Sequence, residues 1–308
     1  MFFKRIYIGT SGWSYDDWIG PFYESDKWMF RFYSSVFNTS EINSTFYKMP
    51  TRSFIRGLAH VAPVGFVFSA KLVKTITHKK LLNPKLGVNE DLKEYLSAIE
   101  PLRKERKLGA ILIQMPPRST KEVPFLEDFL ALLPTNEYRF AIEFRDHSWL
   151  CDDVFNTLEK YNVAYVVVDE PLLPPITKVT ARFSYIRWHG RGERPWYYYQ
   201  YKLEELREWV PKVKEILENT DLLYGYFNNH FRGYAPRNAL QMLSLLGLAT
   251  RRQRHVLKRI EEFMERKEVE KTKLALADAL ASGRVDDILL VFAGERRYNR
   301  GVEIEDNL

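Results

Sequence analysis

The chain has 308 residues, of which 45% are hydrophobic and 28% charged, a composition typical of globular proteins that excludes a wholly disordered chain. The 46 basic and 40 acidic residues give a net charge of +6, which favours anionic partners over cationic ones. The single cysteine, Cys151, excludes an internal disulfide framework and a cysteine-based metal cluster within one chain.

The sequence contains no recognisable targeting or membrane-spanning segment. No stretch approaches the roughly 18 uninterrupted apolar residues of a membrane span, and the opening residues MFFKR lack the apolar region of a signal peptide. We therefore expect a cytoplasmic protein that has no membrane partner. The sequence identifies no protein partner.

Short β-rich runs alternate with longer segments of helical periodicity along most of the chain. The runs that predict strands span residues 6–8, 40–43, 66–71, 110–114, 140–145, 165–169, 185–189 and 222–228. The clearest helical segments, with apolar residues at a spacing of 3.6, span residues 91–104, 123–133, 153–161, 203–217 and 236–248. Strands that recur about every 30 residues are typical of a (β/α)8 barrel.

The main alternative is an open, doubly wound sheet that binds a dinucleotide. Such a sheet usually carries the motif G-x-G-x-x-G in its first turn, and the run GTSGW at residues 9–13 does not match it. The sequence therefore predicts an α/β protein with a TIM-type (β/α)8 barrel.

The character of the chain changes after Ala249, where several basic residues precede the first acidic one. These basic residues are Arg251, Arg252, Arg254, Lys258 and Arg259. We expect two domains, the barrel at residues 1–249 and a C-terminal helical extension at residues 250–308. Thr250 is suited to cap the first helix of the extension, and Gly283 is suited to end a second one.

Polar side chains gather where the predicted strands end. These residues are Glu41, Asn43, Lys71, Gln114, Glu143, Arg145, Asp169, Arg187, His189, Asn228 and Asn229. In a barrel the carboxyl ends of the strands form the catalytic face, and residues two apart on a strand share one side. Burying many ionisable groups is costly unless they are paired, and barrel stability does not require them at this end. The pattern therefore predicts a ligand pocket at the barrel mouth.

The strand-end residues include a candidate set of ligands for a divalent metal. This set is Glu41, Glu143, Asp169 and His189, because carboxylate and imidazole groups are common ligands of such ions. However, Lys71, Arg145 and Arg187 balance the three acids, which favours anion recognition or internal pairing over a dedicated metal cage. The identity of any metal stays open, and a divalent ion is an optional cofactor.

Two reactions without a metal also fit these residues. Glu143 and His189 can exchange protons while arginine and lysine hold an anionic group, which suits phosphate ester chemistry. A pair of carboxylates, Glu143 with Glu41 or Asp169, suits a glycosidase instead. The separation of the carboxylates distinguishes the two reactions, and the sequence does not supply it.

Two predicted loops are rich in aromatic residues. The loop after the first strand carries six aromatic residues between residues 13 and 28, and the loop at residues 189–201 combines arginines with Trp196 and four tyrosines. Such side chains stack on the bases of single-stranded nucleic acids and on sugars. Aromatic clusters also pack as lids on a barrel rim, so both interpretations stay open.

Taken together, the strand-end runs resemble a known family. The runs are GTSGWSYDDW (9–18), EINSTFYKMP (41–50), FSAKLVKTITH (68–78), ILIQMPP (111–117), AIEFRDHSW (141–149), the strand that ends in Asp169, YIRWHG (185–190) and YGYFNN (224–229). In this order, over residues 6–245, they resemble the YecE-like family, domain of unknown function 72. The resemblance implies a TIM-type barrel and brings no settled activity. It adds Tyr47 and His78 to the strand-end residues as positions of the family's motifs.

These observations lead to one hypothesis and two alternatives. The hypothesis is a hydrolase that binds an anionic, phosphate-containing ligand at the barrel mouth, most concretely DNA or RNA, and cleaves a phosphodiester bond. Its catalytic candidates are Glu143, His189, Glu41 and Asp169. Its ligand-binding candidates are Asn43, Tyr47, Lys71, His78, Gln114, Arg145, Arg187, Asn228 and Asn229. The alternatives are a carbohydrate-active enzyme and a non-catalytic module that binds nucleic acid or a nucleotide.

Overall fold

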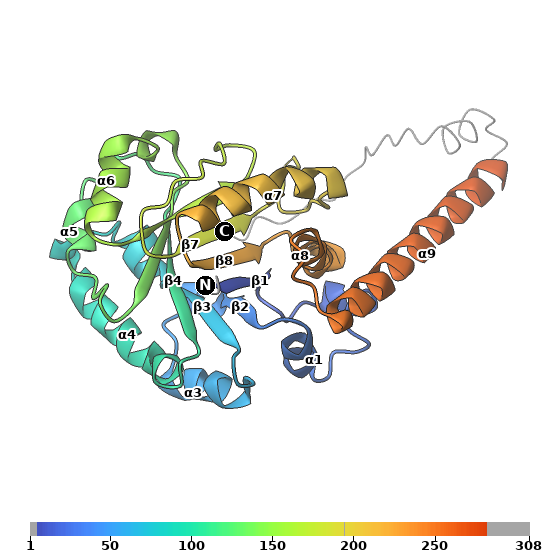
Figure 1. Cartoon of the computed structure of the whole chain (residues 1–308), viewed down its shortest axis with the longest axis horizontal. Helices are drawn as coiled ribbons and strands as arrows, with labels where there is room; N and C mark the ends of the chain where they lie inside the picture. The colour runs from blue at the N-terminus through green and yellow to red at the C-terminus, as the bar shows by residue number, and fades with distance from the viewer. Residues whose placement is uncertain (1–4, 194, 282–308) are drawn as a thin grey trace. The chain divides into compact units, whose positions relative to one another are not determined.

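Eight parallel strands close into a barrel in the order in which they occur in the chain (Figure 1). The structure, a computed structural model, describes residues 5–193 and 195–281. The strands are β1 (Arg5–Ser11), β2 (Thr39–Ile42), β3 (Val67–Lys71), β4 (Leu108–Gln114), β5 (Arg139–Glu143), β6 (Ala164–Asp169), β7 (Ser184–Trp188) and β8 (Leu222–Phe227). Each strand pairs with the next, and β8 closes the barrel against β1. The predicted TIM-type barrel is confirmed.

Helices surround the strands (Figure 1). They are α1 (Met29–Val36), α2 (Ser44–Tyr47), α3 (Arg52–Val61), α4 (Val88–Lys104), α5 (Leu126–Leu130), α6 (Asp152–Lys160), α7 (Leu203–Glu218) and α8 (Tyr234–Leu245). The connections also contain the 3-10 helices η1 (Asp16–Trp18), η3 (Pro84–Leu86), η4 (His147–Trp149) and η5 (Phe231–Gly233), and the π-helical segment η2 (Thr75–Lys79).

The helix predicted at residues 123–133 is shorter than expected. Helix α5 spans only Leu126–Leu130, and the residues at positions 124 and 125 before it form a turn. The other helices with clear periodicity occur where the sequence predicts them. Their apolar residues are buried on one face, as Leu206, Trp209 and Val213 are in α7.

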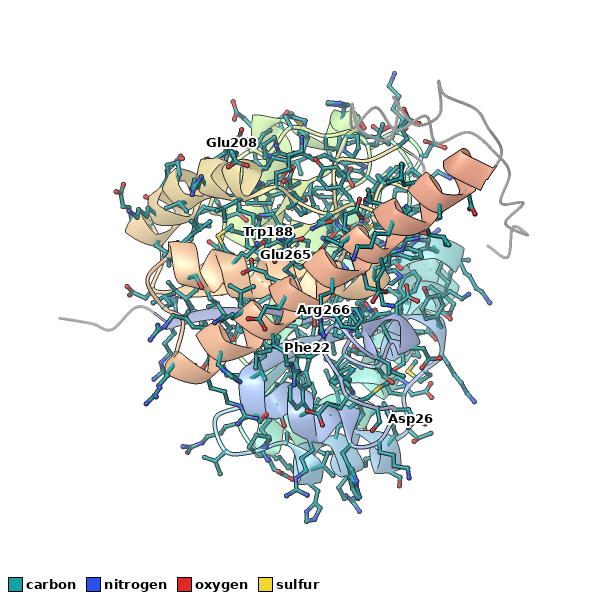
Figure 2. The ribbon with its side chains drawn as sticks, turned by 90° about the vertical axis from the view of Figure 1, so that its right-hand side faces the viewer. Phe22, Asp26, Trp188, Glu208, Glu265 and Arg266 are labelled. Carbon is teal, nitrogen blue, oxygen red and sulfur yellow. The ribbon has the colours of Figure 1, made fainter. Side chains whose placement is uncertain are left out.

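Large aromatic side chains fill the space between the strands and the surrounding helices. Trp188 of β7, labelled in Figure 2, is fully buried. Its ring stacks on Phe227 with centroids 4.4 Å apart and meets Trp209 of α7 edge to face at 5.6 Å. Residues inside the barrel include Tyr185 and Tyr226, which leave little room for a central pore.

The described residues after Thr250 form one helix, α9 (Arg251–Ala281). Thr250 caps it as predicted, because its hydroxyl accepts a hydrogen bond from the N–H of Gln253 at 3.2 Å. The second helix expected to end at Gly283 does not begin before Ala281, and Gly283 lies outside the described residues.

The chain divides into two compact units within α9, the first ending at Lys258 and the second beginning at Arg259. The predicted domain boundary at residue 249 stays a prediction. In the second unit Glu265 and Arg266, labelled in Figure 2, are exposed. In residues 5–193 and 195–281, no helix combines the length and apolar character that crossing a bilayer requires.

Candidate active site

A cavity of about 630 Å³ opens at the carboxyl ends of the strands. It is lined by Tyr15, Asn43, Tyr47, Lys71, His78, Gln114, Met115, Pro117, Arg145, Glu170, Leu172, His189, Trp196, Tyr197, Asn228 and His230. Its volume falls within the range of cavities that hold small molecules and cofactors. We call this cavity the mouth pocket.

A network of ion pairs lies beneath the mouth pocket, centred on Arg187. One guanidinium nitrogen of Arg187 donates to Glu41 at 2.7 Å, and the other donates to Glu143 at 2.8 Å. Glu41 also accepts hydrogen bonds from the hydroxyls of Ser11 at 2.5 Å and Tyr185 at 2.6 Å. These charged groups are fully buried, and their mutual pairing offsets the cost of removing them from water.

Arg145 connects this network to the surface of the mouth pocket. Its two terminal nitrogens form ion pairs with Glu143 and Glu170. Burial opposes the ionisation of Glu143, but the charges of Arg145 and Arg187 outweigh it and hold its pKa well below the ordinary value. At Glu170 the effect of burial prevails over the charge of Arg145 and raises the pKa of the carboxyl. The two carboxyls therefore differ in their readiness to take up a proton.

His189 is neutral at physiological pH. Burial, reinforced by the charge of Arg145, lowers the pKa of its imidazole to about 3. Its Nε2 lies 3.0 Å from a nitrogen of Arg145 and 3.4 Å from an oxygen of Glu143. Its Nδ1 lies 3.0 Å from the side-chain amide of Asn228. The imidazole is thus held between the ion-pair network and the pocket.

Lys71, the last residue of β3, differs from the arginines because its charge has no acceptor. Only 8% of the residue is exposed, and its ammonium lies over the Phe46 ring at 4.7 Å from the centroid. Among the described residues none accepts a hydrogen bond or forms an ion pair with its Nζ. Burial, with the charge of Arg187, lowers its pKa to about 8. Burial and the Lys71 charge also lower the pKa of the nearby His78 to about 4.

Eight of the site residues predicted from the sequence line the mouth pocket. They are Asn43, Tyr47, Lys71, His78, Gln114, Arg145, His189 and Asn228. The structure places Glu41, Glu143 and Arg187 directly beneath them, in the buried network.

Asp169 and Asn229 do not face the pocket. The carboxylate of Asp169 accepts hydrogen bonds from Arg191 at 2.9 Å and from the indole of Trp209 in α7 at 2.7 Å. The amide of Asn229 donates to the carbonyl of Tyr199 at 2.8 Å. Both residues therefore hold the loop between β7 and α7 in place.

The structure does not bring the four candidate metal ligands, Glu41, Glu143, Asp169 and His189, together around one point. Glu41 and Glu143 direct their oxygens to guanidinium groups, and Asp169 points away from the other three residues. In the described part of the chain, no group of three or more His, Cys, Asp or Glu side chains is arranged to hold a metal ion.

The site residues predicted from the sequence omit one carboxylate and one imidazole of the pocket lining, Glu170 and His230. Asp169 and Glu170 are consecutive acids at the end of β6, so the alternation of side chains sends only one of them inward. His230 lies between two tyrosines, because its ring stacks on Tyr15 at 4.8 Å and on Tyr197 at 5.5 Å. These three rings form an aromatic wall that joins the first loop to the loop after β7.

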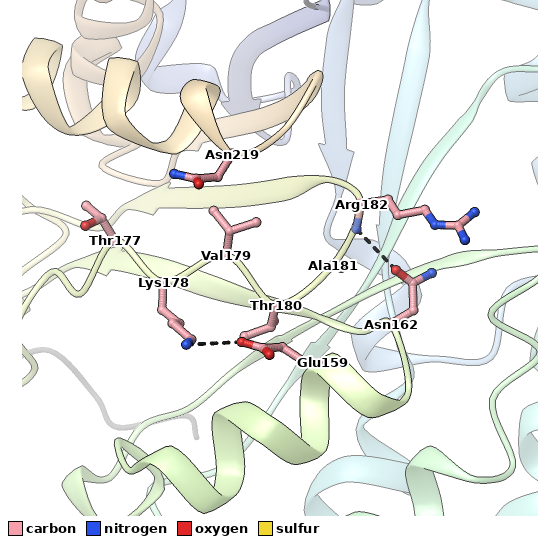
Figure 3. Close-up of a pocket in the computed structure, with 9 residues that line it drawn as sticks. All are labelled: Glu159, Asn162, Thr177, Lys178, Val179, Thr180, Ala181, Arg182 and Asn219. Carbon is pink, nitrogen blue, oxygen red and sulfur yellow. Dashed lines mark hydrogen bonds and ion pairs between the residues drawn. The ribbon is translucent and has the colours of Figure 1, made fainter.

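Another hollow, of about 640 Å³, lies at the opposite end of the strands, between α6, the segment before β7 and Asn219 (Figure 3). There Lys178 pairs with Glu159 at 3.1 Å, and the backbone N–H of Arg182 donates to Asn162 at 3.2 Å. None of the predicted site residues lines it. The mouth pocket is therefore the candidate active site, as expected for the carboxyl end of a barrel.

Comparison with known proteins identifies the family. The family described as "Protein of unknown function DUF72" matches residues 7–262. The UPF0759 protein YunF of Bacillus subtilis (strain 168) is 27% identical over 271 residues, which cover 79% of this chain and 95% of that protein.

Solved structures of DUF72 family proteins are also similar. The one from Thermotoga maritima MSB8 is 33% identical with a TM-score of 0.71, and the match covers 79% of this chain and 99% of that one. One from Enterococcus faecalis V583, 22% identical with a TM-score of 0.68, shows the same fold over 81% of this chain and 100% of its own. The chain therefore belongs to the DUF72 family.

Proposed function

We propose that the mouth pocket is the active site of a hydrolase that binds a phosphate-bearing ligand and cleaves a phosphodiester bond in a single-stranded nucleic acid. The observation that carries the proposal is the buried ammonium of Lys71, which lines the pocket without an acceptor among the described residues. The guanidinium groups of Arg145 and Arg187 are already paired with carboxylates. Of these three strand-end cations, Lys71 is thus the one that is available to a ligand.

A phosphate group suits the surroundings of Lys71. A charge in a buried position interacts more strongly with an anion than a charge in water does. The amides of Asn43, Gln114 and Asn228 also line the pocket, and amide N–H groups donate to phosphate oxygens without adding charge. One phosphate beside Lys71 would receive a charge-assisted hydrogen bond and several neutral ones.

The aromatic wall of Tyr15, His230 and Tyr197 supports a ligand with flat rings. Bases of single-stranded nucleic acids stack on such side chains with little dependence on sequence. The mouth pocket, at about 630 Å³, has room for one or two nucleotides and not for a duplex. This combination of an available cation and an aromatic wall favours a single strand over a free sugar.

Glu170 is the carboxyl best placed to transfer a proton in the proposed reaction. In that reaction a water oxygen forms a bond to phosphorus while Glu170 accepts the water proton, and the bond from phosphorus to the leaving oxygen breaks. Lys71 stabilises the charge on the phosphoryl oxygens and supplies a proton to the leaving oxygen. Glu143, held as an anion by two arginines, is less suited to this role, and neutral His189 contributes a hydrogen bond.

The proposal is tested with fluorescent single-stranded DNA and RNA oligonucleotides and the full-length protein, with and without added Mg²⁺. We expect Glu170→Gln and Lys71→Met each to lower the cleavage rate by about a hundredfold or more. The control is Glu208→Gln, which alters an exposed carboxylate of α7 (Figure 2) and leaves the rate unchanged. A wild-type protein that cleaves neither oligonucleotide, or a Glu170→Gln variant within twofold of it, contradicts the proposal.

A further inference from the structure

A cluster of arginines surrounds a cavity of about 290 Å³ at the amino-terminal end of the barrel, opposite the mouth pocket. Arg5 begins β1 and Arg139 begins β5. Arg106 lies in the turn that precedes β4, with a backbone φ of +56°. All three side chains are exposed and line the same cavity. We call this cavity the basal pocket.

Tyrosine rings form the floor of the basal pocket. Tyr7 and Tyr224 stack with their centroids 5.5 Å apart and their planes at 18°. The close packing of these rings requires a glycine at position 109, since a Cβ atom there would lie 3.0 Å from the Tyr224 ring. Burial raises the pKa of Tyr224 to about 12, while the charges of Arg139 and Arg5 act on it in the opposite direction. Both guanidinium groups therefore lie close enough to Tyr224 to influence it.

The positive charge of the basal pocket is largely uncompensated. A fourth arginine of the lining, Arg103, donates to Glu100 twice at 2.8 Å and lies 3.8 Å from Glu137. The other three arginines have no ion-pair partner among the described residues. Glu137 is the acidic residue of the lining, so four arginines face one carboxylate. Guanidinium groups that converge without partners repel one another, and a bound anion removes that repulsion.

We propose that the basal pocket is a second ligand site, separate from the proposed catalytic one, which binds a compact diphosphate group. Guanidinium groups bind phosphate oxygens in a bidentate manner, and three of them match a diphosphate better than a single phosphate. Tyr7 and Tyr224 of the lining add hydroxyls that can form hydrogen bonds. Free pyrophosphate and the diphosphate of a nucleotide present the same chemistry to these residues. The site stands whether or not the mouth pocket cleaves nucleic acid.

Calorimetric titration of the full-length protein with pyrophosphate tests the site. We expect a dissociation constant below about 1 mM for the wild type, and an affinity at least about tenfold lower for the double variant Arg5→Gln/Arg139→Gln. The matched control is Arg182→Gln, an exposed arginine at the same end of the barrel (Figure 3), which should change the affinity less than twofold. Wild-type protein without binding, or a double variant no weaker than the control, overturns the proposal.

Two further variants test the site even if the double variant does not fold. Arg106→Gln alters a turn and not a strand, and it should weaken pyrophosphate binding about threefold or more even if the double variant fails to fold. Wild-type affinity in Arg106→Gln overturns the proposal. Lys71→Met should keep the pyrophosphate site, whereas loss of binding there would place the ligand in the mouth pocket and overturn it as well.

Titration with ADP separates the two sources of the diphosphate group. Tighter binding of ADP than of pyrophosphate supports the site with a nucleotide as its ligand, and tighter binding of pyrophosphate supports it with the free anion.

Discussion

Arg187 organises the buried charges beneath the mouth pocket. Its guanidinium bridges Glu41 and Glu143, and all three side chains are almost completely removed from solvent. A buried ion pair contributes little net stability, but removing one partner leaves an uncompensated charge and is costly. The network therefore serves to hold Glu143 ionised, and through it Arg145 and His189 in position.

His189 should make the protein sensitive to mild acid. Its pKa in the folded state is about 3, whereas the ordinary value in an unfolded chain is about 6.5. Because the folded pKa is the lower one, the contribution of His189 to stability is complete above pH 6.5 and falls as the pH drops toward 3. We expect a loss of about 1.4 kcal/mol per pH unit in that window, measured as the free energy of unfolding in urea.

The variant His189→Gln isolates this contribution. Between pH 6.5 and 5 most carboxylates stay ionised, so the difference in slope between the wild type and His189→Gln reports on this imidazole. The variant should lose less stability than the wild type over that interval. Equal slopes would show that His189 titrates normally in the folded protein.

The loop between β7 and α7 forms one side of the mouth pocket and depends on a single tight turn. Gly190 has a φ of +110°, and its N–H donates to the hydroxyl of Tyr201 at 2.9 Å. A Cβ atom at this position would clash with the carbonyl of Trp196 and lie 2.7 Å from the Cβ of Tyr199. The turn thus brings Trp196 and Tyr197 to the pocket.

Replacing Gly190 with alanine should disturb this element. We expect Gly190→Ala to lower the free energy of unfolding by roughly 2 kcal/mol, because the residue would be both strained and crowded. Gly192→Ala is the control, since its φ is not positive and the nearest atom to its Cβ lies 3.4 Å away. That variant should stay within about 0.5 kcal/mol of the wild type. Equal effects of the two variants in urea unfolding would contradict this account of the turn.

The sequence predicts the elements better than it predicts the direction of individual side chains. Short β-rich runs that recur about every 30 residues identify all eight strands. At the end of β6 the same reasoning fails, since Asp169 and Glu170 are both acidic and only three-dimensional contacts show which one faces the pocket.

The sequence also does not predict which charged side chains form ion pairs. Lys71, Arg145 and Arg187 look equivalent as strand-end cations, yet two of them pair with carboxylates and one does not. The pairing depends on side-chain length and on contacts across the barrel. His230 was missed for a related reason, because its place between two tyrosines depends on stacking of residues far apart in the chain.

At the scale of the whole molecule, the first turns of α9 belong to the unit that contains the barrel. Gln253 donates to the carbonyl of Val36 at 2.8 Å, and Arg252 donates to the hydroxyl of Ser35 at 2.7 Å. Val256 is buried. The family match likewise continues past this part of the helix, to residue 262. Residues 252–256 of α9 therefore form part of what stabilises the barrel.

Two truncations distinguish this part of α9 from the rest of the helix. A chain that ends after Glu262 should keep most of the stability of the full-length protein. A chain that ends after Ala249 should lose about 2 kcal/mol more, because it lacks the buried Val256 and the hydrogen bond of Gln253. Thermal and urea unfolding measure both. Equal stability of the two truncated chains would show that residues 250–262 contribute nothing to the barrel.

The proposed binding of anions to Lys71 in the mouth pocket should depend on pH, because the ammonium loses its charge when it is deprotonated. The measurement is fluorescence anisotropy of a single-stranded oligonucleotide with the wild type, Lys71→Arg and Lys71→Met. The control is Lys74→Met, because Lys74 is a nearby lysine that does not line the pocket.

The pKa of Lys71 is about 8, so wild-type affinity should be about thirtyfold weaker at pH 9.5 than at pH 7. Lys71→Arg should lose this dependence, because a guanidinium stays charged, and Lys71→Met should bind weakly at both pH values. If Lys71→Met keeps the wild-type affinity and the wild-type pH profile, Lys71 does not bind the oligonucleotide.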